Sequence, residues 1–229
     1  MLKHYAKNID VVICEGTALS RTSACPMSER ELGRKAKEWM NGKPYVFVLC
    51  ASTNIDRIGA FYHANPRGRL FVCDAYQKEM LELVRGEHAE KSNYYDFRYV
   101  FSYAQNLDTR IEEKGFCMLI RQGREFRPHL EKYFSGTYRE KSLLIYSMWQ
   151  GYLKSSTKNQ ALYDFLSPYP HSVLHTSGHA SPENLERLYR TVDPKLGLIP
   201  IHGESPEDFT TLIPDGNIII LNDGESFEL

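Results

Sequence analysis

The sequence has no apolar run that approaches the roughly 20 residues needed to span a bilayer. Its N-terminus also lacks a secretory pattern. Lysine and arginine total 28 and aspartate and glutamate total 29, so the formal net charge is -1. This balance excludes a histone-like protein that binds nucleic acid through bulk charge, although it allows a local basic cleft. We therefore expect no membrane partner.

Cysteine pairs with the spacing of a metal site are also missing, because no CxxC occurs. The five cysteines are Cys14, Cys25, Cys50, Cys73 and Cys117. Their number is odd, and three of them lie in apolar, strand-like runs. Buried reduced thiols are the best explanation, so we expect a cytoplasmic protein.

The phosphate-binding motifs GxGxxG and GxxxxGK[ST] do not occur either. A Rossmann-like nucleotide-binding protein therefore ranks last among the function classes, although βα alternation alone would permit it. The 229 residues are 42% hydrophobic and 25% charged, which is enough for a substantial core. We expect a compact α/β body of one or two lobes.

Apolar runs alternate with segments of helical periodicity. The strand-like runs are 11–14, 45–50, 69–73, 97–101, 116–120, 143–149, 172–176, 196–201 and 217–221. The helical segments are 28–40, 54–64, 75–86, 158–166 and 183–190. This alternation predicts an α/β fold with a largely parallel sheet and flanking helices.

Residues 176–204 are the most informative stretch. His179 and His202 each follow an apolar run and lie next to a glycine. Between them, Ser181 and Pro182 predict the start of an amphipathic helix. In such a strand-helix-strand unit the carboxyl ends of neighbouring parallel strands lie side by side. We therefore expect the two imidazoles to face one pocket.

SGHAS, followed by a helix and then PIHGE, resembles motifs B and C of the β-CASP branch of the metallo-β-lactamase fold. Members of this family include ribonuclease J and the pre-mRNA 3′-end endonuclease. VVICEGT places Glu15 at the strand end where the family carries its acidic motif A. The resemblance implies that residues 21–165 form a β-CASP domain. Residues 1–20 and 166–229 would be the C-terminal portion of a metallo-β-lactamase αββα fold, with Pro168 and Pro170 at the return crossing.

The family's metal site depends mainly on an N-terminal half with an HxHxDH signature, and this sequence has no HxH pair. Only His202 matches one of its metal ligands. Zinc normally needs three or four protein ligands. We expect this chain to be the C-terminal part of a nuclease-like hydrolase that begins at an internal Met1. It would be inactive alone, and zinc would occupy a two-metal site only in the complete protein.

The resemblance also implies roles in metal-dependent hydrolysis of nucleic-acid phosphodiesters, in which zinc lowers the pKa of bound water to about 7. His202 would be a metal ligand, and His179 would assist the departing oxygen or stabilise the phosphate. Glu15 would orient His179 by accepting its other N–H. The alternatives are a hydrogen-bonded loop histidine for His179 and a helix cap or surface carboxylate for Glu15.

Two loops are candidates for binding phosphate. The first precedes a helix, whose N-terminal amides attract anions, and ribonuclease J holds the terminal phosphate of RNA with this type of loop. The second follows a predicted strand and equally suits an ordinary helix N-cap. The first loop contributes Gly178, His179, Ala180 and Ser181; the second contributes Ser52, Thr53, Asn54 and Arg57, with added charge from Arg21.

His171, His175 and His179 are spaced by four residues, which is the spacing of ligands on a helix. Neighbouring prolines and Gly178 argue against a helix there, so a separate metal site is not favoured. Most aromatic side chains are expected in the core. Trp149 and Tyr152 follow a strand end, and we predict that they lie near the cleft between the lobes.

Two functions from different classes remain. The first is a nuclease of the ribonuclease J type, which acts on RNA or single-stranded DNA. The second is a non-catalytic nucleic-acid-binding or assembly subunit that uses the same cleft. Joint retention of Glu15, His179 and His202 favours the first function. An incomplete lactamase lobe would expose apolar sheet surface, so the missing N-terminal half or a second copy is the expected partner.

Overall fold

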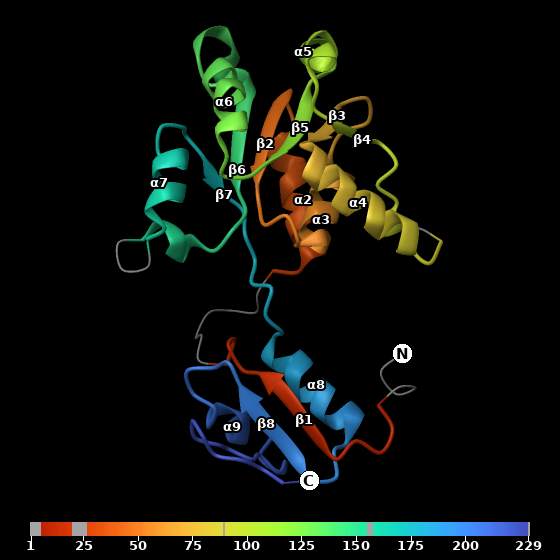
Figure 1. Cartoon of the computed structure of the whole chain (residues 1–229), viewed down its shortest axis with the longest axis vertical. Helices are drawn as coiled ribbons and strands as arrows, with labels where there is room; N and C mark the ends of the chain where they lie inside the picture. The colour runs from red at the N-terminus through yellow and green to blue at the C-terminus, as the bar shows by residue number, and fades with distance from the viewer. Residues whose placement is uncertain (1–5, 20–26, 89, 155–157, 229) are drawn as a thin grey trace. The chain divides into compact units, whose positions relative to one another are not determined.

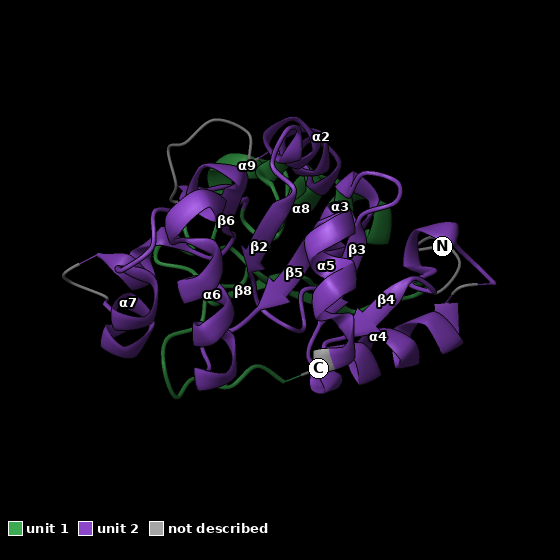
Figure 2. Cartoon of the chain, turned by 90° about the horizontal axis from the view of Figure 1, so that it is seen from above, with its two compact units in different colours: residues 1–26, 177–229 green, residues 27–176 purple. Residues whose placement is uncertain are grey.

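A computed structural model describes residues 6–19, 27–88, 90–154 and 158–228 (Figure 1). The chain forms two compact units, coloured separately in Figure 2. Unit 1 consists of residues 1–26 and 177–229, and unit 2 of residues 27–176. Arg21 and Cys25 lie outside the described residues. Within the described parts of the chain, no helix is long and apolar enough to cross a membrane.

Unit 2 is built on a six-stranded sheet in the order β4-β3-β5-β2-β6-β7, and every strand pair in it is parallel. The strands are β2 (Tyr45–Leu49), β3 (Leu70–Cys73), β4 (Val100–Ser102), β5 (Phe116–Ile120), β6 (Ser142–Tyr146) and β7 (Ser172–Val173). All residues of β2 and β5 are buried, as expected for a parallel sheet covered on both faces. The predicted α/β fold with a parallel sheet is confirmed. Its assignment as a β-CASP domain stays a prediction.

Helices cover both faces of this sheet. They are α2 (Glu29–Met40), α3 (Ile55–Ala64), α4 (Ala75–His88), α5 (Asp108–Lys114), α6 (Arg127–Tyr133) and α7 (Gln160–Leu166). Leu32, Phe61 and Leu81 place α2, α3 and α4 in the core on one face. Leu130 and Phe165 place α6 and α7 in the core on the other face, together with α5. The sheet is therefore the middle of three layers.

Unit 1 contains a two-stranded parallel sheet of β1 (Val11–Glu15) and β8 (Gly197–Ile201). Two helices, α8 (Pro182–Val192) and α9 (Asp208–Leu212), accompany it. Val12, Leu198 and Phe209 lie in its core. The prediction of a strand at residues 217–221 was wrong, because only an isolated bridge joins Ile218 to Leu198 there.

The passage from unit 2 back to unit 1 lies at 176/177. The boundary expected at 165/166 falls inside α7, and residues 166–176 pack with unit 2. Leu166 and Tyr169 are buried in its core, and β7 adds to the edge of its sheet. Pro168 and Pro170 therefore precede the crossing. Helices α5 and α6 have seven residues each and α9 has five, and these three were not predicted from the sequence.

The four cysteines among the described residues are free thiols. Cys50, Cys73 and Cys117 lie in the core of unit 2, where burial raises the pKa of each to about 12. In Cys14, burial and then the charge of Glu15 raise the pKa to about 11. These thiols stay protonated at neutral pH and are therefore poor nucleophiles and metal ligands.

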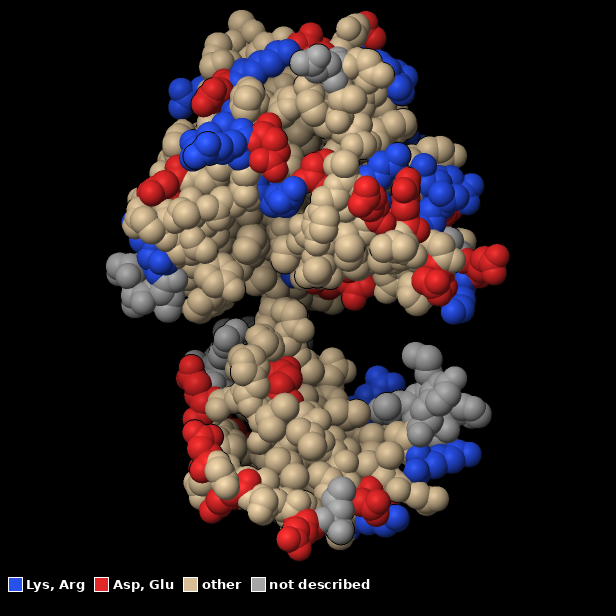
Figure 3. All heavy atoms as spheres, viewed as in Figure 1, with Lys and Arg blue, Asp and Glu red and all other residues tan. Residues whose placement is uncertain are grey.

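Charge is distributed differently over the two units. Acidic side chains gather along one side of unit 1 in Figure 3, while both signs are interspersed on the visible face of unit 2. From residue 201 to residue 229, every charged residue of the Asp, Glu, Lys and Arg types is acidic. This part of unit 1 therefore carries negative charge.

Candidate functional site

The motif residues of unit 1 meet where β1 and β8 end. Glu15 is the last residue of β1 and pairs in register with Ile201, the last residue of β8. His202 follows directly, and the amide of Gly16 donates to the carbonyl of Ile201 (3.2 Å). Because parallel strands end at the same edge of a sheet, Glu15 and Ile201 are neighbours although they are 186 positions apart in the sequence. This edge is the candidate site.

Glu15 is the central acceptor of the site. Its Oε2 accepts the amide of Thr17 (2.8 Å) and lies 3.3 Å from Nδ1 of His179. Its Oε1 accepts the amide of Ala180 (3.0 Å). One carboxylate thus joins the end of β1 to the loop before α8. It also faces Nδ1 of His179, which leaves Nε2 as the ring atom able to exchange a proton with a ligand.

The environment of Glu15 favours its ionised form. Burial raises the pKa of this carboxyl, but hydrogen bonds from Thr17 and Ala180 and the charge of His179 outweigh burial. The pKa therefore lies below its ordinary value. At neutral pH the site contains a carboxylate that only accepts hydrogen bonds.

This shift predicts how the site responds to acid. A carboxyl whose pKa is lower in the folded state stabilises the fold fully at a pH above its pKa in the unfolded chain, which is about 4.3 for Glu. This stabilisation is lost as the pH falls through the pKa of the folded state. We expect hydrogen-exchange protection of the Thr17 and Ala180 amides to decline in the wild type as the pH falls below about 4.3. In Glu15→Gln, protection should be lower at pH 6 and change less. The Val48 amide in β2 is the internal control, and equal pH dependence in both proteins would contradict the assignment.

Thr17 links β1 to His202. Its hydroxyl donates to the carbonyl of His202 (2.7 Å) and lies 3.4 Å from Nδ1 of the same residue. Because the single hydroxyl proton is used on the carbonyl, Nδ1 of His202 must be the donor in the second contact. Neutral His202 then carries its lone pair on Nε2, the form that binds metals. The sequence prediction missed Thr17, because the partner of its hydroxyl, His202, lies 185 positions away.

The backbone of the site is tightly fitted. A side chain on Gly16 would come within 2.8 Å of the Phe209 ring, and one on Gly203 within 3.3 Å of Gly16. His202 has a φ of 49°, in the left-handed region that non-glycine residues rarely adopt. Such backbone is retained where the surroundings fix it. It places His202 with its ring centroid 6.1 Å from that of His179.

The loop predicted to bind phosphate is already hydrogen-bonded in part. The amide of His179 donates to Ser177 Oγ (3.2 Å), and the Ala180 amide is held by Glu15. Ser181 caps α8 by accepting the amide of Asn184. Open space surrounds the Cα of Gly178, where a ligand can approach the backbone. In this structure the Ala180 amide therefore donates to Glu15, whereas the sequence predicted that this loop would donate to a phosphate.

The described residues do not form a complete metal site. In the ranges of the chain that the structure describes, no group of three or more His, Cys, Asp or Glu residues is arranged to hold an ion. Glu15 is engaged by two amides and His179, and only His202 presents a suitable nitrogen. Zinc needs more ligands than this, so the described residues alone do not fit a zinc ion.

The second predicted loop lies in unit 2, after β2. Ser52 lines a cavity of about 400 Å³ together with Arg121 and Gln122, which follow β5. The strands β2 and β5 are parallel neighbours, but the connections that follow them run in opposite directions across the sheet, from β2 to β3 and from β5 to β6. Ligands of open α/β sheets bind at such reversals. Gln77 donates to the carbonyl of Ser52 (3.0 Å) and braces the loop.

Thr53 and Asn54 continue this loop into α3. Thr53 is exposed, and Asn54 caps the helix by accepting the amide of Arg57 (3.1 Å). The N-cap alternative therefore describes Asn54 in this structure. The predicted phosphate-binding role of this loop stays a prediction.

The structure contradicts the phosphate-binding role predicted for Arg57. Its side chain is 0% exposed, and all five of its N–H groups are directed at partners within unit 2. These partners are both oxygens of Glu29 (2.8 Å each), Ser147, His175 Nδ1 (3.1 Å) and the carbonyl of Thr176 (2.9 Å). A guanidinium used in this way has no donor left for a phosphate. Sequence reasoning missed this cluster because its members lie up to 119 positions from Arg57.

The remaining candidates have local contacts. Burial, followed by the charge of Arg57, lowers the pKa of His175, which favours its neutral form. His171 lies beside the carbonyl of Tyr169 (3.0 Å). Trp149 and Tyr152 form an edge-to-face pair with centroids 5.3 Å apart, and both are exposed. Their predicted place near a cleft between the lobes stays a prediction.

Comparison with known proteins agrees with the motifs in the C-terminal region. Residues 171–213 match the family model described as the RNA specificity domain of Zn-dependent metallo-hydrolases. This match supports a relationship to the metallo-β-lactamase and β-CASP families. It includes His179 and His202 and the whole of α8. None of the curated proteins matches the chain.

The similarity to a solved structure extends over almost the whole chain. That structure is a crystal structure of a protein of unknown function from Enterococcus faecalis V583, with a TM-score of 0.64 and 21% identity. The similarity covers 98% of this chain and 52% of that one, so this chain spans about half the length of the structure it matches. At this identity the likeness shows the fold alone.

Proposed function

We propose that this chain is the RNA-handling part of a zinc-dependent hydrolase that cleaves phosphodiester bonds. The observation that carries the proposal is the arrangement of Glu15, His179 and His202 at one sheet edge, with a carboxylate 3.3 Å from one imidazole. The family model matched by residues 171–213 supports both RNA as the substrate and zinc as the metal.

Each residue of the site has a defined role in this proposal. Glu15 accepts Nδ1–H of His179 and fixes the ring, so that Nε2 of His179 exchanges a proton with the substrate or binds a phosphate oxygen. Thr17 fixes the tautomer of His202, whose Nε2 completes a metal site. The other ligands of that site come from a separate polypeptide segment.

Unit 1 carries a surface suited to such a segment. Its sheet has two parallel strands, whereas parallel sheets are normally larger and covered on both faces. Val12 and Leu198 pack into the core on one face. On the opposite face Ile13 is 62% exposed, and Ile201 at the end of β8 is 50% exposed. Exposed apolar sheet surface of this kind marks a contact with another chain or segment.

The test compares the chain alone with the chain purified from its own cells through an affinity tag. Both samples are assayed on 5′-labelled single-stranded RNA with added zinc, and their metal content is measured. We expect the isolated chain to bind zinc weakly and not to cleave. The chain purified with its cellular partner should cleave, and His202→Ala in the same preparation should abolish cleavage because a metal ligand is lost.

His171→Ala is the matched control, since His171 lies in unit 2, where it contacts the carbonyl of Tyr169 and the edge of the Tyr146 ring. It should cleave at the wild-type rate. Cleavage that persists in the His202→Ala preparation would show that the activity belongs to a contaminant or to another site. Stoichiometric zinc in the isolated chain that survives His202→Ala would equally reject the proposed ligand.

A non-catalytic RNA-binding subunit is the second candidate. The absence of a group of three metal-ligating residues from the described part of the chain favours it. The same experiment separates the two functions. A binding subunit would retain RNA binding in every preparation and would show no cleavage that depends on His202.

A further inference from the structure

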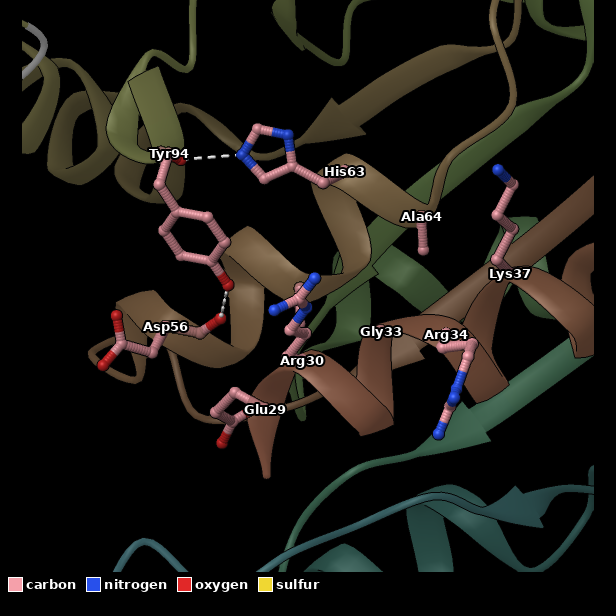
Figure 4. A pocket seen from close by; sticks show the side chains of 10 residues that line it. Glu29, Arg30, Gly33, Arg34, Lys37, Asp56, His63, Ala64 and Tyr94 are labelled. Carbon is pink, nitrogen blue, oxygen red and sulfur yellow. Dashed lines mark hydrogen bonds between the residues drawn. The ribbon is translucent and has the colours of Figure 1, made fainter. Parts of the chain in front are cut away.

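Unit 2 contains a groove of about 600 Å³ between helices α2 and α3 (Figure 4). Its floor is made by Gly33 of α2 and by Ala60 and Ala64 of α3. A side chain on Gly33 would lie 3.3 Å from the carbonyl oxygen of Ala60, so the two helices approach closely there. The small residues leave an open, largely apolar floor of a size that suits a small organic ligand.

The rim of the groove on α2 is basic. Arg30, Arg34 and Lys37 recur at the spacing of one helix face and line the groove together. None of the ion pairs found among the described residues involves these three side chains. At 1.5 Å per residue they cover about 10 Å along α2, which is enough for more than one phosphate.

The acidic residues in the groove do not cancel this charge. Glu29 also lines it, but both of its carboxylate oxygens bind Arg57. Asp56 remains, and its Oδ1 accepts the hydroxyl of Tyr95 (2.8 Å). With Glu29 neutralised by Arg57, the three cations face one acidic group. The groove therefore attracts anions.

The opposite wall is aromatic. Tyr94 and His63 have ring centroids 4.9 Å apart at an angle of 30°. The hydroxyl of Tyr94 donates to the carbonyl of Asp56 (2.9 Å), and Nε2 of His63 lies 2.8 Å from the carbonyl of Tyr94 (Figure 4). Gly59 lets the Tyr94 ring lie directly on α3, because a side chain there would be 2.6 Å from the ring. This wall is fixed before any ligand arrives.

We propose that this groove binds a nucleotide, with its base against the Tyr94–His63 wall and its phosphates on Arg30, Arg34 and Lys37. An aromatic wall, an apolar floor and a cationic rim match the three parts of such a ligand. A bare polyanion would have no use for the wall and floor, and an apolar ligand would leave the cations unpaired. The same chemistry serves a free nucleotide and one unit of an RNA strand.

The test measures fluorescence anisotropy of the full chain with two probes in EDTA, a labelled 12-nucleotide single-stranded RNA and labelled ADP. We expect Arg34→Ala/Lys37→Ala to weaken binding at least tenfold for each probe that the wild type binds. If RNA is bound, the plot of log affinity against log salt should be shallower for this double variant, with a slope smaller in magnitude by about 2. Binding of RNA alone assigns the groove to a strand, and binding of ADP assigns it to the free nucleotide.

Lys35→Ala/Lys114→Ala is the matched control. It removes the same charge from exposed positions of unit 2 that do not line the groove, and it should weaken binding less than twofold. Equal loss in both double variants, or no loss in the groove variant, would overturn the proposal. If ADP does not bind, an abasic 12-mer that binds as tightly as the RNA would overturn the role of the base.

The experiment is independent of the proposed hydrolase function. The measurements need no metal and no cleavage, and they are repeated in a His179→Ala background. We expect the groove variant to cause the same fold-loss there, since Arg34 and Lys37 lie in a different unit from His179. A loss that disappears in the His179→Ala background would place the binding at the histidine site and reject the groove.

Discussion

Replacing His179 with alanine is expected to slow RNA cleavage about 10²- to 10⁴-fold, the usual contribution of a general acid or base. The cleaving species is the chain together with its cellular partner, which we call the complete assembly. His179 is the only imidazole in the described part of unit 1 besides His202, and it is held by Glu15 with Nδ1 3.3 Å from the carboxylate. Alanine removes the proton-exchanging Nε2 and leaves the fold of unit 1 intact, because His179 is not in its core.

The expected effect separates chemistry from binding. Single-turnover kinetics with saturating assembly should show a slower step, while the dissociation constant for RNA changes far less. Glu15→Gln should slow the step by about 10- to 100-fold, because an amide holds the imidazole less well than a carboxylate does. In the double variant the two losses should not add, since Glu15 acts through His179.

The matched control is again His171→Ala, which removes an imidazole from unit 2. Two results would contradict the assigned roles. One is a His179→Ala assembly that cleaves within a few-fold of the wild type. The other is additive losses in the double variant, which would mean that Glu15 contributes independently of His179.

The parts of the fold that the sequence predicted are those with local patterns. The runs at 45–50 and 116–120 are long and apolar enough to be recognised as buried strands, and they became β2 and β5. Ser28 with Glu31 forms a capping box that marks the start of α2. Glu15, His179 and His202 could be placed together because each follows a strand, and parallel strands end at one edge.

The parts that could not be predicted depend on contacts between distant residues. Nothing near Arg57 in the sequence indicates that Glu29, Ser147 and Thr176 surround it, so an arginine beside a polar loop suggested a phosphate contact. The strand expected at 217–221 has the right composition, but only one residue pair forms a bridge with β8. Composition predicts the tendency to form a strand, whereas pairing depends on the surrounding fold.

Replacing Arg57 with alanine is expected to lower the free energy of unfolding of unit 2 by about 3–5 kcal/mol, as when one partner of a buried ion pair is removed. The change leaves Glu29 without its cation and also frees buried acceptors on Ser147 and Thr176. Glu29 lies near the start of unit 2 and Thr176 at its end, so Arg57 joins the two ends of this unit. The Thr176 hydroxyl adds a bond to the carbonyl of Met27.

Urea unfolding followed by tryptophan fluorescence measures this loss. Both tryptophans of the chain, Trp39 and Trp149, lie in unit 2, so the signal reports on this unit alone. Arg57→Lys should fall between wild type and alanine, because an ammonium keeps the charge but offers three donors in place of a planar fork. Arg67→Ala, at an exposed position, should change stability by less than about 0.5 kcal/mol.

The same variants decide between the two roles considered for Arg57. If the guanidinium only joins the ends of unit 2, Arg57→Lys should bind RNA as the wild type does under conditions where both are folded. If it binds phosphate, Arg57→Ala should unfold at nearly the wild-type urea concentration and bind RNA more weakly. The five N–H groups directed at Glu29, Ser147, His175 and Thr176 favour the first outcome, because a donor released to a ligand would leave one of these buried partners unpaired.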